Sequence, residues 1–216
     1  VSLLFRSEYN APLPMLTFVK KEIDNISAFL QTEKIDIHQQ TDEVLKNQFA
    51  KSNIIHIAAH TILDSTEAPV IFLKDPLSTD QIRYLEIKSP LVFLSACNTG
   101  TGESLPSEGT ESIQRVFLSK NVPSVISTYW FANDETMLLI TSNFYRLLAQ
   151  LENPITALAE SKRKYLQAAN SQAQNPWYWA NINYAGVGNN IGLKKSSNLY
   201  LYFTLGAILS LCYFQR

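Results

Sequence analysis

Short apolar runs alternate along this chain with stretches whose apolar residues recur at helical spacing. The clearest runs cover residues 1–5, 53–59, 91–95 and 123–128, and none of them contains Lys, Arg, Asp or Glu. Strands with one face in water alternate apolar and polar residues, whereas continuous runs are typical of parallel strands covered on both faces. We therefore expect these four runs to be buried strands of one parallel sheet.

Helices are predicted between these runs. Leu16, Val19, Ile23, Ile26 and Leu30 recur every three or four residues, as on one face of a helix. Helix starts are predicted at Thr41, at Ser78 in a capping box with Gln81, at Asn133, and at Asn153 before Pro154, with a further helix over 109–120. Strands alternating with helices predict an α/β fold, in which a mostly parallel sheet carries helices on both faces.

Three shorter segments are also predicted as strands. Residues 35–38 alternate apolar and polar positions, and residues 69–73 are mostly apolar, so both are predicted as strands. Residues 177–184 are rich in aromatic side chains, and we expect them to form a closing edge strand. We expect one domain over residues 1–190, because the chain has 216 residues and a second compact domain has no room.

Composition excludes two classes of function. The formal net charge is −1 and no run of Lys or Arg follows one face, so we expect no nucleic-acid partner. Cys97 and Cys212 are the only cysteines and lie far apart in the sequence, which argues against a disulfide framework and favours a reducing compartment.

The chain begins at Val1 inside an apolar run, so we expect further sequence before it.

The last residues differ abruptly in composition from the rest. After a predicted linker over 191–198, residues 199–214 contain no charged side chain. A helix of this length spans about 24 Å, which is less than the ~30 Å hydrocarbon core of a bilayer. Tyrosines near both ends, Lys194 and Lys195 before the segment and Arg216 after it resemble interfacial anchors. We expect a membrane anchor on the cytoplasmic face of a membrane; the alternative is a core or partner-binding helix.

Cys97 and His60 are the strongest candidates for chemistry. A lone cysteine is usually a small buried hydrophobe, but Cys97 follows the apolar run at 91–95 and His60 follows the run at 53–59. If these strands are adjacent and parallel, thiol and imidazole reach the same edge of the sheet. A nearby imidazolium favours the thiolate and can protonate a leaving amine, which is the chemistry of cysteine hydrolases.

The other titratable residues have less specific interpretations. His56 and His60 stand about 13 Å apart on an extended strand, too far for a shared metal, so His56 is predicted to be a hydrogen-bonded core residue. Glu103, Glu108 and Asp134 follow strand ends, and they either line a pocket for a basic group or are solvated loop carboxylates. Neither a phosphate-binding loop nor a serine-hydrolase motif is present, and we expect no cofactor and no metal.

Seven motifs follow one another along residues 13–186. They are residues 56–60, 91–100, 108–109, 124–130 with Asp134 and Thr136, 144–145, 157–158 and 176–180. In order and spacing they resemble the CHAT family of caspase-like cysteine peptidase domains, which typically occur in bacteria beside tetratricopeptide repeats. The resemblance implies a caspase-like three-layer α/β/α sandwich and a regulatory repeat or sensor region before Val1.

The resemblance also implies a mechanism. His60 and Cys97 match the family's dyad, so Cys97 would attack a peptide carbonyl of a protein substrate, His60 would protonate the departing amine, and water would hydrolyse the thioester. The backbone N–H groups of Cys97 and Thr61 are the expected oxyanion donors. Thr61 departs from the glycine that usually follows the histidine in this family. The alternative is therefore a catalytically silent caspase-like module for signalling or protein binding.

Overall fold

A computed structural model describes residues 1–9, 13, 15–37, 42–63, 69–95, 102–105, 109–130 and 133–194, with the backbone alone at 42, 63, 102–105 and 109–111. Cys97, Glu108, Thr41 and the tail from residue 195 lie outside the described residues. The domain boundary and the linker predicted near residue 190 therefore stay predictions.

A six-stranded sheet forms the middle layer of the domain. Its order is β11-β10-β7-β3-β1-β2, and every neighbouring pair is parallel except β10 with β11. The strands are β1 (Ser2–Phe5), β2 (Glu33–Asp36), β3 (Ile54–Ala58), β7 (Leu91–Ser95), β10 (Ser124–Thr128) and β11 (Ile182–Gly186). The four apolar runs are thus β1, β3, β7 and β10 at the centre of one mostly parallel sheet, which confirms the predicted fold class.

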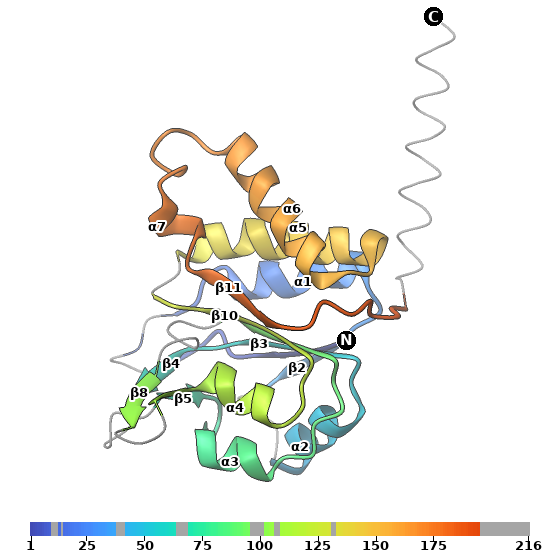
Figure 1. Cartoon of the computed structure of the whole chain (residues 1–216), viewed down its shortest axis with the longest axis vertical. Helices are drawn as coiled ribbons and strands as arrows, with labels where there is room; N and C mark the ends of the chain where they lie inside the picture. The colour runs from blue at the N-terminus through green and yellow to red at the C-terminus, as the bar shows by residue number, and fades with distance from the viewer. Residues whose placement is uncertain are drawn as a thin grey trace, which may run out of the picture.

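Two layers of helices cover the two faces of this sheet (Figure 1). One layer holds α1 (Val19–Phe29), α5 (Asp134–Leu151) and α6 (Pro154–Ala168), and the other holds α2 (Asp42–Lys51), α3 (Thr79–Tyr84) and α4 (Ile113–Ser119). Consecutive strand residues face opposite layers. In β3, Ile54 and Ala58 pack toward α1 and α5, whereas Ile55 and Ile57 pack toward α2 and α4. Continuous apolar runs are required because both faces are buried.

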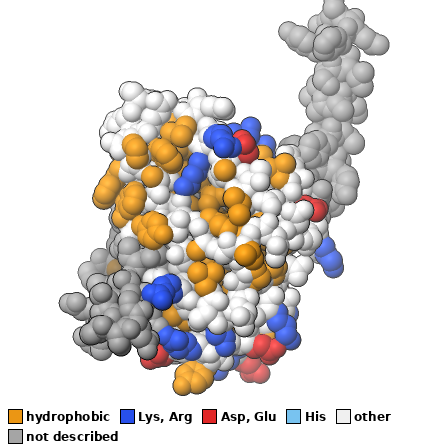
Figure 2. Space-filling view, viewed as in Figure 1, with side chains coloured by type: hydrophobic (Ala, Val, Ile, Leu, Met, Phe, Trp, Pro, Cys, Tyr) orange, Lys and Arg blue, Asp and Glu red, His pale blue; other side chains and the backbone are white. Residues whose placement is uncertain are grey.

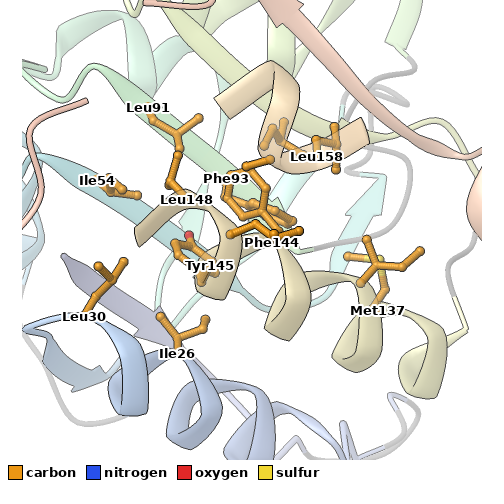
Figure 3. Close-up of a cluster of buried hydrophobic side chains, with 14 of the residues drawn as sticks. Ile26, Leu30, Ile54, Leu91, Phe93, Met137, Phe144, Tyr145, Leu148 and Leu158 are labelled. Carbon is orange, nitrogen blue, oxygen red and sulfur yellow. The ribbon is translucent and has the colours of Figure 1, made fainter. Parts of the chain in front are cut away.

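The core on the α1 and α5 side is the larger of the two. Figure 3 shows Leu91 and Phe93 of β7 facing Phe144 and Tyr145 of α5. Phe93 lies 5.3 Å from Phe144 and 5.9 Å from Tyr145 between ring centroids, within the range of favourable aromatic pairs. This packing holds α5 against the middle of the sheet.

The predicted capping residues Ser78, Asn133 and Asn153 are confirmed at the starts of α3, α5 and α6. Asn133 accepts a hydrogen bond from the backbone N–H of Thr136, and Asn153 accepts one from Thr156. Ser78 and Gln81 form both bonds of the capping box at the start of α3. These side chains satisfy backbone donors that the first helical turn leaves without a partner.

The strand predicted over residues 69–73 is confirmed, and it belongs to a small antiparallel sheet. Residues 69–73 form β5 (Pro69–Phe72), which pairs with β4 (Thr61–Leu63) and β6 (Pro76–Leu77) and not with the main sheet. The helix predicted over 109–120 starts only at Ile113, because residues 109–112 form β9 (Gly109–Ser112) opposite β8 (Gly102–Leu105). The Ser112 side chain accepts from the Arg115 N–H and so caps the shortened helix.

The predicted edge strand over 177–184 is also wrong in its first half. Asn175 caps a short helix, α7 (Pro176–Trp179), and proline at the first helical position favours that turn. The strand β11 begins at Ile182 and runs antiparallel to β10 at the edge of the sheet. Sequence composition alone did not separate the aromatic turn from the strand.

Membrane association stays a prediction. None of the helices within residues 1–194, in the parts that are described, combines the length and the apolar character needed to cross a bilayer. Residues 199–214, on which the prediction rests, lie outside the described residues.

We expect Gly186→Ala to destabilise the domain by at least about 2 kcal/mol. Gly186 has a φ of +111°, and an added Cβ would lie 2.0 Å from the carbonyl oxygen of Pro123. The matched control is Gly192→Ala, because an added Cβ there meets nothing within 4 Å. Chemical denaturation of both variants checks the prediction, and equal stabilities would contradict it.

Candidate active site

The carboxyl ends of β3 and β7 define the candidate site. These strands are neighbours and parallel, and Ala58 lies opposite Ser95. His60 follows Ala58 by two residues and Cys97 follows Ser95 by two residues, so the two candidates hold equivalent positions after paired residues. The predicted adjacency of the two strands is confirmed. Cys97 itself lies outside the described residues, and its distance from His60 stays a prediction.

His60 is held by contacts on two sides. Its backbone N–H donates to the hydroxyl of Tyr9 at 3.0 Å, and its carbonyl oxygen accepts from the Phe72 N–H at 2.8 Å. The Tyr9 ring meets the imidazole edge-to-face, with centroids 4.6 Å apart. The backbone of His60 is therefore fixed between the segment after β1 and strand β5.

Tyr9 is supported in turn by a buried arginine. The Arg6 guanidinium lies 4.6 Å from the centroid of the Tyr9 ring and 5.1 Å from that of Phe72. Arg6 is 7% exposed and donates to the carbonyl oxygens of Glu8 and Leu73. Burial raises the pKa of Tyr9 to about 12, so its hydroxyl remains protonated at neutral pH. Sequence analysis missed both residues, since nothing in the sequence indicates that β1 lies beside β3.

Thr61 presents its backbone N–H away from β5. The hydrogen bond from Phe72 to His60 makes Thr61 and Ile71 a pair that is not hydrogen-bonded, so both amides of this pair point outward. Strand β4 is an edge of its sheet. The side-chain oxygen of Thr61 is buried without a hydrogen-bond partner among the described residues.

Asp134 is the only predicted pocket carboxylate whose side chain is described. It is the first residue of α5 and is half-buried. Burial and, secondly, the charge of Glu22 raise the pKa of Asp134, whereas His60 lowers it. Asp134 therefore lies within electrostatic reach of His60. The backbone of Glu103 lies in β8, and Glu108 lies outside the described residues, so the predicted pocket stays a prediction.

A buried carboxylate lies below the ends of β3 and β7. Glu22 of α1 is 3% exposed and accepts hydrogen bonds from the Ser95 hydroxyl, at 3.0 Å to Oε1 and 3.3 Å to Oε2. His56 Nε2 lies 3.4 Å from Glu22 Oε1, an electrostatic contact whose geometry does not make a hydrogen bond. His56 Nδ1 lies 3.1 Å from the Tyr145 hydroxyl, with which it forms a hydrogen bond.

His56 is therefore a hydrogen-bonded core residue, as predicted, and is fully buried. Burial and, secondly, the charge of Glu22 raise the pKa of Tyr145 well above its usual value, so Tyr145 is a neutral partner for His56. In the described part of the chain, no group of three His, Cys, Asp or Glu side chains is arranged to hold a metal ion. Glu22 and Ser95 were not anticipated, because their contact joins residues 73 positions apart.

Aromatic side chains lie beyond the carboxyl end of β10. Trp130 stacks on Trp177 with ring centroids 5.5 Å apart, and its indole N–H donates to the Trp177 carbonyl at 2.9 Å. Trp177 remains 59% exposed. The two indoles therefore pack against each other beyond the end of this strand. On the face drawn in Figure 2, Lys and Arg side chains are scattered among neutral and apolar ones, in line with the absence of a basic stripe in the sequence.

Several solved structures resemble this chain, and the one that aligns with a TM-score above 0.5 supports the fold. The crystal structure of gingipain R, described as an Arg specific cysteine proteinase, aligns with a TM-score of 0.55 at 8% identity, covering 89% of this chain and 47% of that one. Caspase-1 from Spodoptera frugiperda aligns at 0.49 and 13% identity, covering 90% and 89%. A secreted C11 cysteine protease from Bacteroides thetaiotaomicron aligns at 0.48 and 11%, covering 84% and 62%.

At 8% identity the likeness to gingipain R is one of fold, and the chain spans about half the length of that protein. No curated protein matches the chain. A family model, the CHAT domain, matches residues 6–187, which is most of the sequence. The resemblance seen in the motifs is thereby confirmed, and the chain belongs to the CHAT domain family.

Proposed function

We propose that this chain is a cysteine endopeptidase with His60 and Cys97 as its catalytic dyad. The observation that carries the proposal is the register of β3 and β7, in which Ala58 lies opposite Ser95 two residues before each candidate. Membership of the CHAT family supports it. Gingipain R, a protein of this fold, is itself described as a cysteine proteinase.

In the proposed mechanism, the Cys97 thiolate attacks the carbonyl carbon of a peptide bond. The C–N bond breaks, the amine leaves with a proton from His60, and an acyl group stays on Cys97 as a thioester. Water then hydrolyses the thioester, releasing the acid and regenerating the thiol. The outward-pointing N–H of Thr61 and that of Cys97 are the proposed oxyanion donors.

The proposed substrate is a protein segment that carries a basic side chain. Asp134 lies within electrostatic reach of His60 and provides a carboxylate for such a side chain. Glu103 and Glu108 are further candidates from the sequence for the same pocket. A repeat or sensor region before Val1 is the proposed regulator.

A second candidate function is a catalytically silent module that binds partners in signalling. The observation that favours it is Thr61, which occupies the position where the family usually has glycine. Its buried hydroxyl adds bulk beside the proposed oxyanion donor.

We expect a peptidyl acyloxymethyl ketone, which alkylates active-site thiols, to label Cys97. Cys212→Ser removes the only other thiol, so the label reports on Cys97 alone. His60→Ala should slow labelling by about 100-fold or more, because the general acid and thiolate partner is lost. Cys97→Ala should abolish labelling, as measured by intact mass.

His38→Ala is the matched control for the histidine substitution. His38 follows β2, which is separated from β3 by β1, so its loss should leave labelling unchanged. Labelling that is equally slow with and without His60 would favour the silent module.

We further propose that residues 199–214 anchor the chain in the cytoplasmic face of the bacterial inner membrane. Full-length protein is expected in the carbonate-resistant membrane pellet, whereas a chain ending at residue 198 should remain in the supernatant. Full-length protein in the supernatant would contradict the anchor. The partner-binding alternative predicts that pelleting depends on other proteins, which vesicles of purified lipid exclude.

Tyr9→Phe should lower the free energy of unfolding at pH 7 by about 1 kcal/mol, because the His60 N–H loses its acceptor. The difference from wild type should shrink and then reverse as the pH rises from 10 to 12, because wild type loses about 2 kcal/mol over this range. The pKa of Tyr9 is about 12 in the folded chain but about 10 when unfolded, so wild type loses stability over this range as unfolded tyrosine ionises. Denaturant titrations at several pH values check this.

The exposed Tyr84 provides the control for Tyr9, since Tyr84→Phe should match wild type at every pH. A difference between Tyr9→Phe and wild type that does not change with pH would contradict the raised pKa of Tyr9.

A further inference from the structure

Glu22 connects three elements below the proposed dyad. Its carboxylate belongs to α1, accepts from Ser95 at the end of β7, and lies 3.4 Å from His56 in β3. Ser95 precedes Cys97 by two residues, and His56 precedes His60 by four. We infer that Glu22 is a positioning residue, which fixes the ends of β3 and β7 and thereby sets the separation of His60 and Cys97. The inference rests on the proposed function.

The alternation of side chains between the two faces of the sheet, along β3 and β7, supports this assignment. Ile54 and Ala58 of β3 face the layer of α1 and α5, as do Leu91 and Phe93 of β7, whereas Ala59 faces the opposite layer. Continued alternation directs His60 toward α1 and α5. The electrostatic effect of His60 on Asp134, at the start of α5, agrees with that direction. Glu22 and the proposed catalytic histidine therefore share one face of the sheet.

The chemistry of the site makes a purely packing role for Glu22 a poor explanation. Burying a carboxylate is costly, and apolar residues of similar size often stabilise a core equally well. Glu22 lies in the first turn of α1, where the helix dipole favours a negative charge, and this offsets part of the cost. What the carboxylate adds over an apolar side chain is a directional bond to the last residue of β7.

A fixed strand end matters for this reaction. Nucleophilic attack requires reacting atoms about 3–3.5 Å apart, and a displacement of about 1 Å can cost about 100-fold in rate. Ser95 is followed by the segment that carries Cys97. Any displacement of Ser95 therefore also displaces the nucleophile. Release of the Glu22–Ser95 bond should therefore slow the chemical step and leave substrate binding nearly unchanged.

The test uses the full chain with Cys212→Ser and the peptidyl acyloxymethyl ketone, and it measures the maximal inactivation rate kinact and the probe constant KI. Ser95→Ala and Glu22→Ala should each lower kinact by about 10- to 100-fold with KI changed by less than about 2-fold. The double variant should be no slower than the slower single variant, because both remove the same link.

Two conservative variants and one control separate positioning from general stability. Ser95→Thr retains the hydroxyl and Glu22→Gln retains an acceptor, so both should keep kinact within about 3-fold of wild type. Ser2→Ala is the matched control, because the Ser2 hydroxyl also bonds a side chain, that of Gln48 at 2.6 Å, but at the amino end of β1. It should lower the melting temperature as Ser95→Ala does and leave kinact unchanged.

Three outcomes would contradict the inference. If wild type is labelled in a His60-dependent manner but Ser95→Ala and Glu22→Ala react as fast, the inference is wrong and the proposed function stands. If Ser2→Ala slows labelling as much as Ser95→Ala, the effect is one of stability and the inference is also wrong. If wild type shows no His60-dependent labelling, the proposed dyad fails and the inference falls with it.

Discussion

The parallel pairing of β3 with β7 is the constraint on which the candidate site depends. Because Ala58 lies opposite Ser95, the segments that follow these residues leave the sheet side by side. A shift of one residue in this register would turn the side chains of one strand to the opposite layer. Two dissimilar layers of helices maintain this register. Each layer packs against one face of the central strands, so apolar residues are required on both faces.

Polar contacts concentrate where the sheet ends. Below the rim, Glu22 joins Ser95 and contacts His56 inside an otherwise apolar layer. At the rim, Tyr9 and Phe72 hold the backbone of His60, and Arg6 lies against both of their rings. These groups come from five separate segments of the chain. An active site built in this way has its geometry set by the scaffold rather than by a single flexible loop.

Local sequence signals were sufficient for most of the elements. The central strands were predicted because burial on both faces demands apolar runs, and the helix starts because Asn133, Asn153 and Ser78 satisfy free backbone donors. Predictions were wrong where pairing partners decide the structure. Residues 109–112, predicted as the start of a helix, pair with β8 in a small antiparallel sheet. Residues 69–73 were correctly predicted as a strand, but no local pattern shows that this strand pairs outside the main sheet.

By itself, the sequence determined the fold class, the family resemblance and the two candidates for the dyad, because periodicity, capping residues and motif order are local properties. Only the tertiary structure decided that β3 and β7 are neighbours in register, and that Tyr9, Glu22 and Ser95 surround the rim. These contacts join residues between 37 and 73 positions apart. They exist because the packing of the helices on the sheet brings those segments together, and this packing is not encoded in any single stretch of the chain.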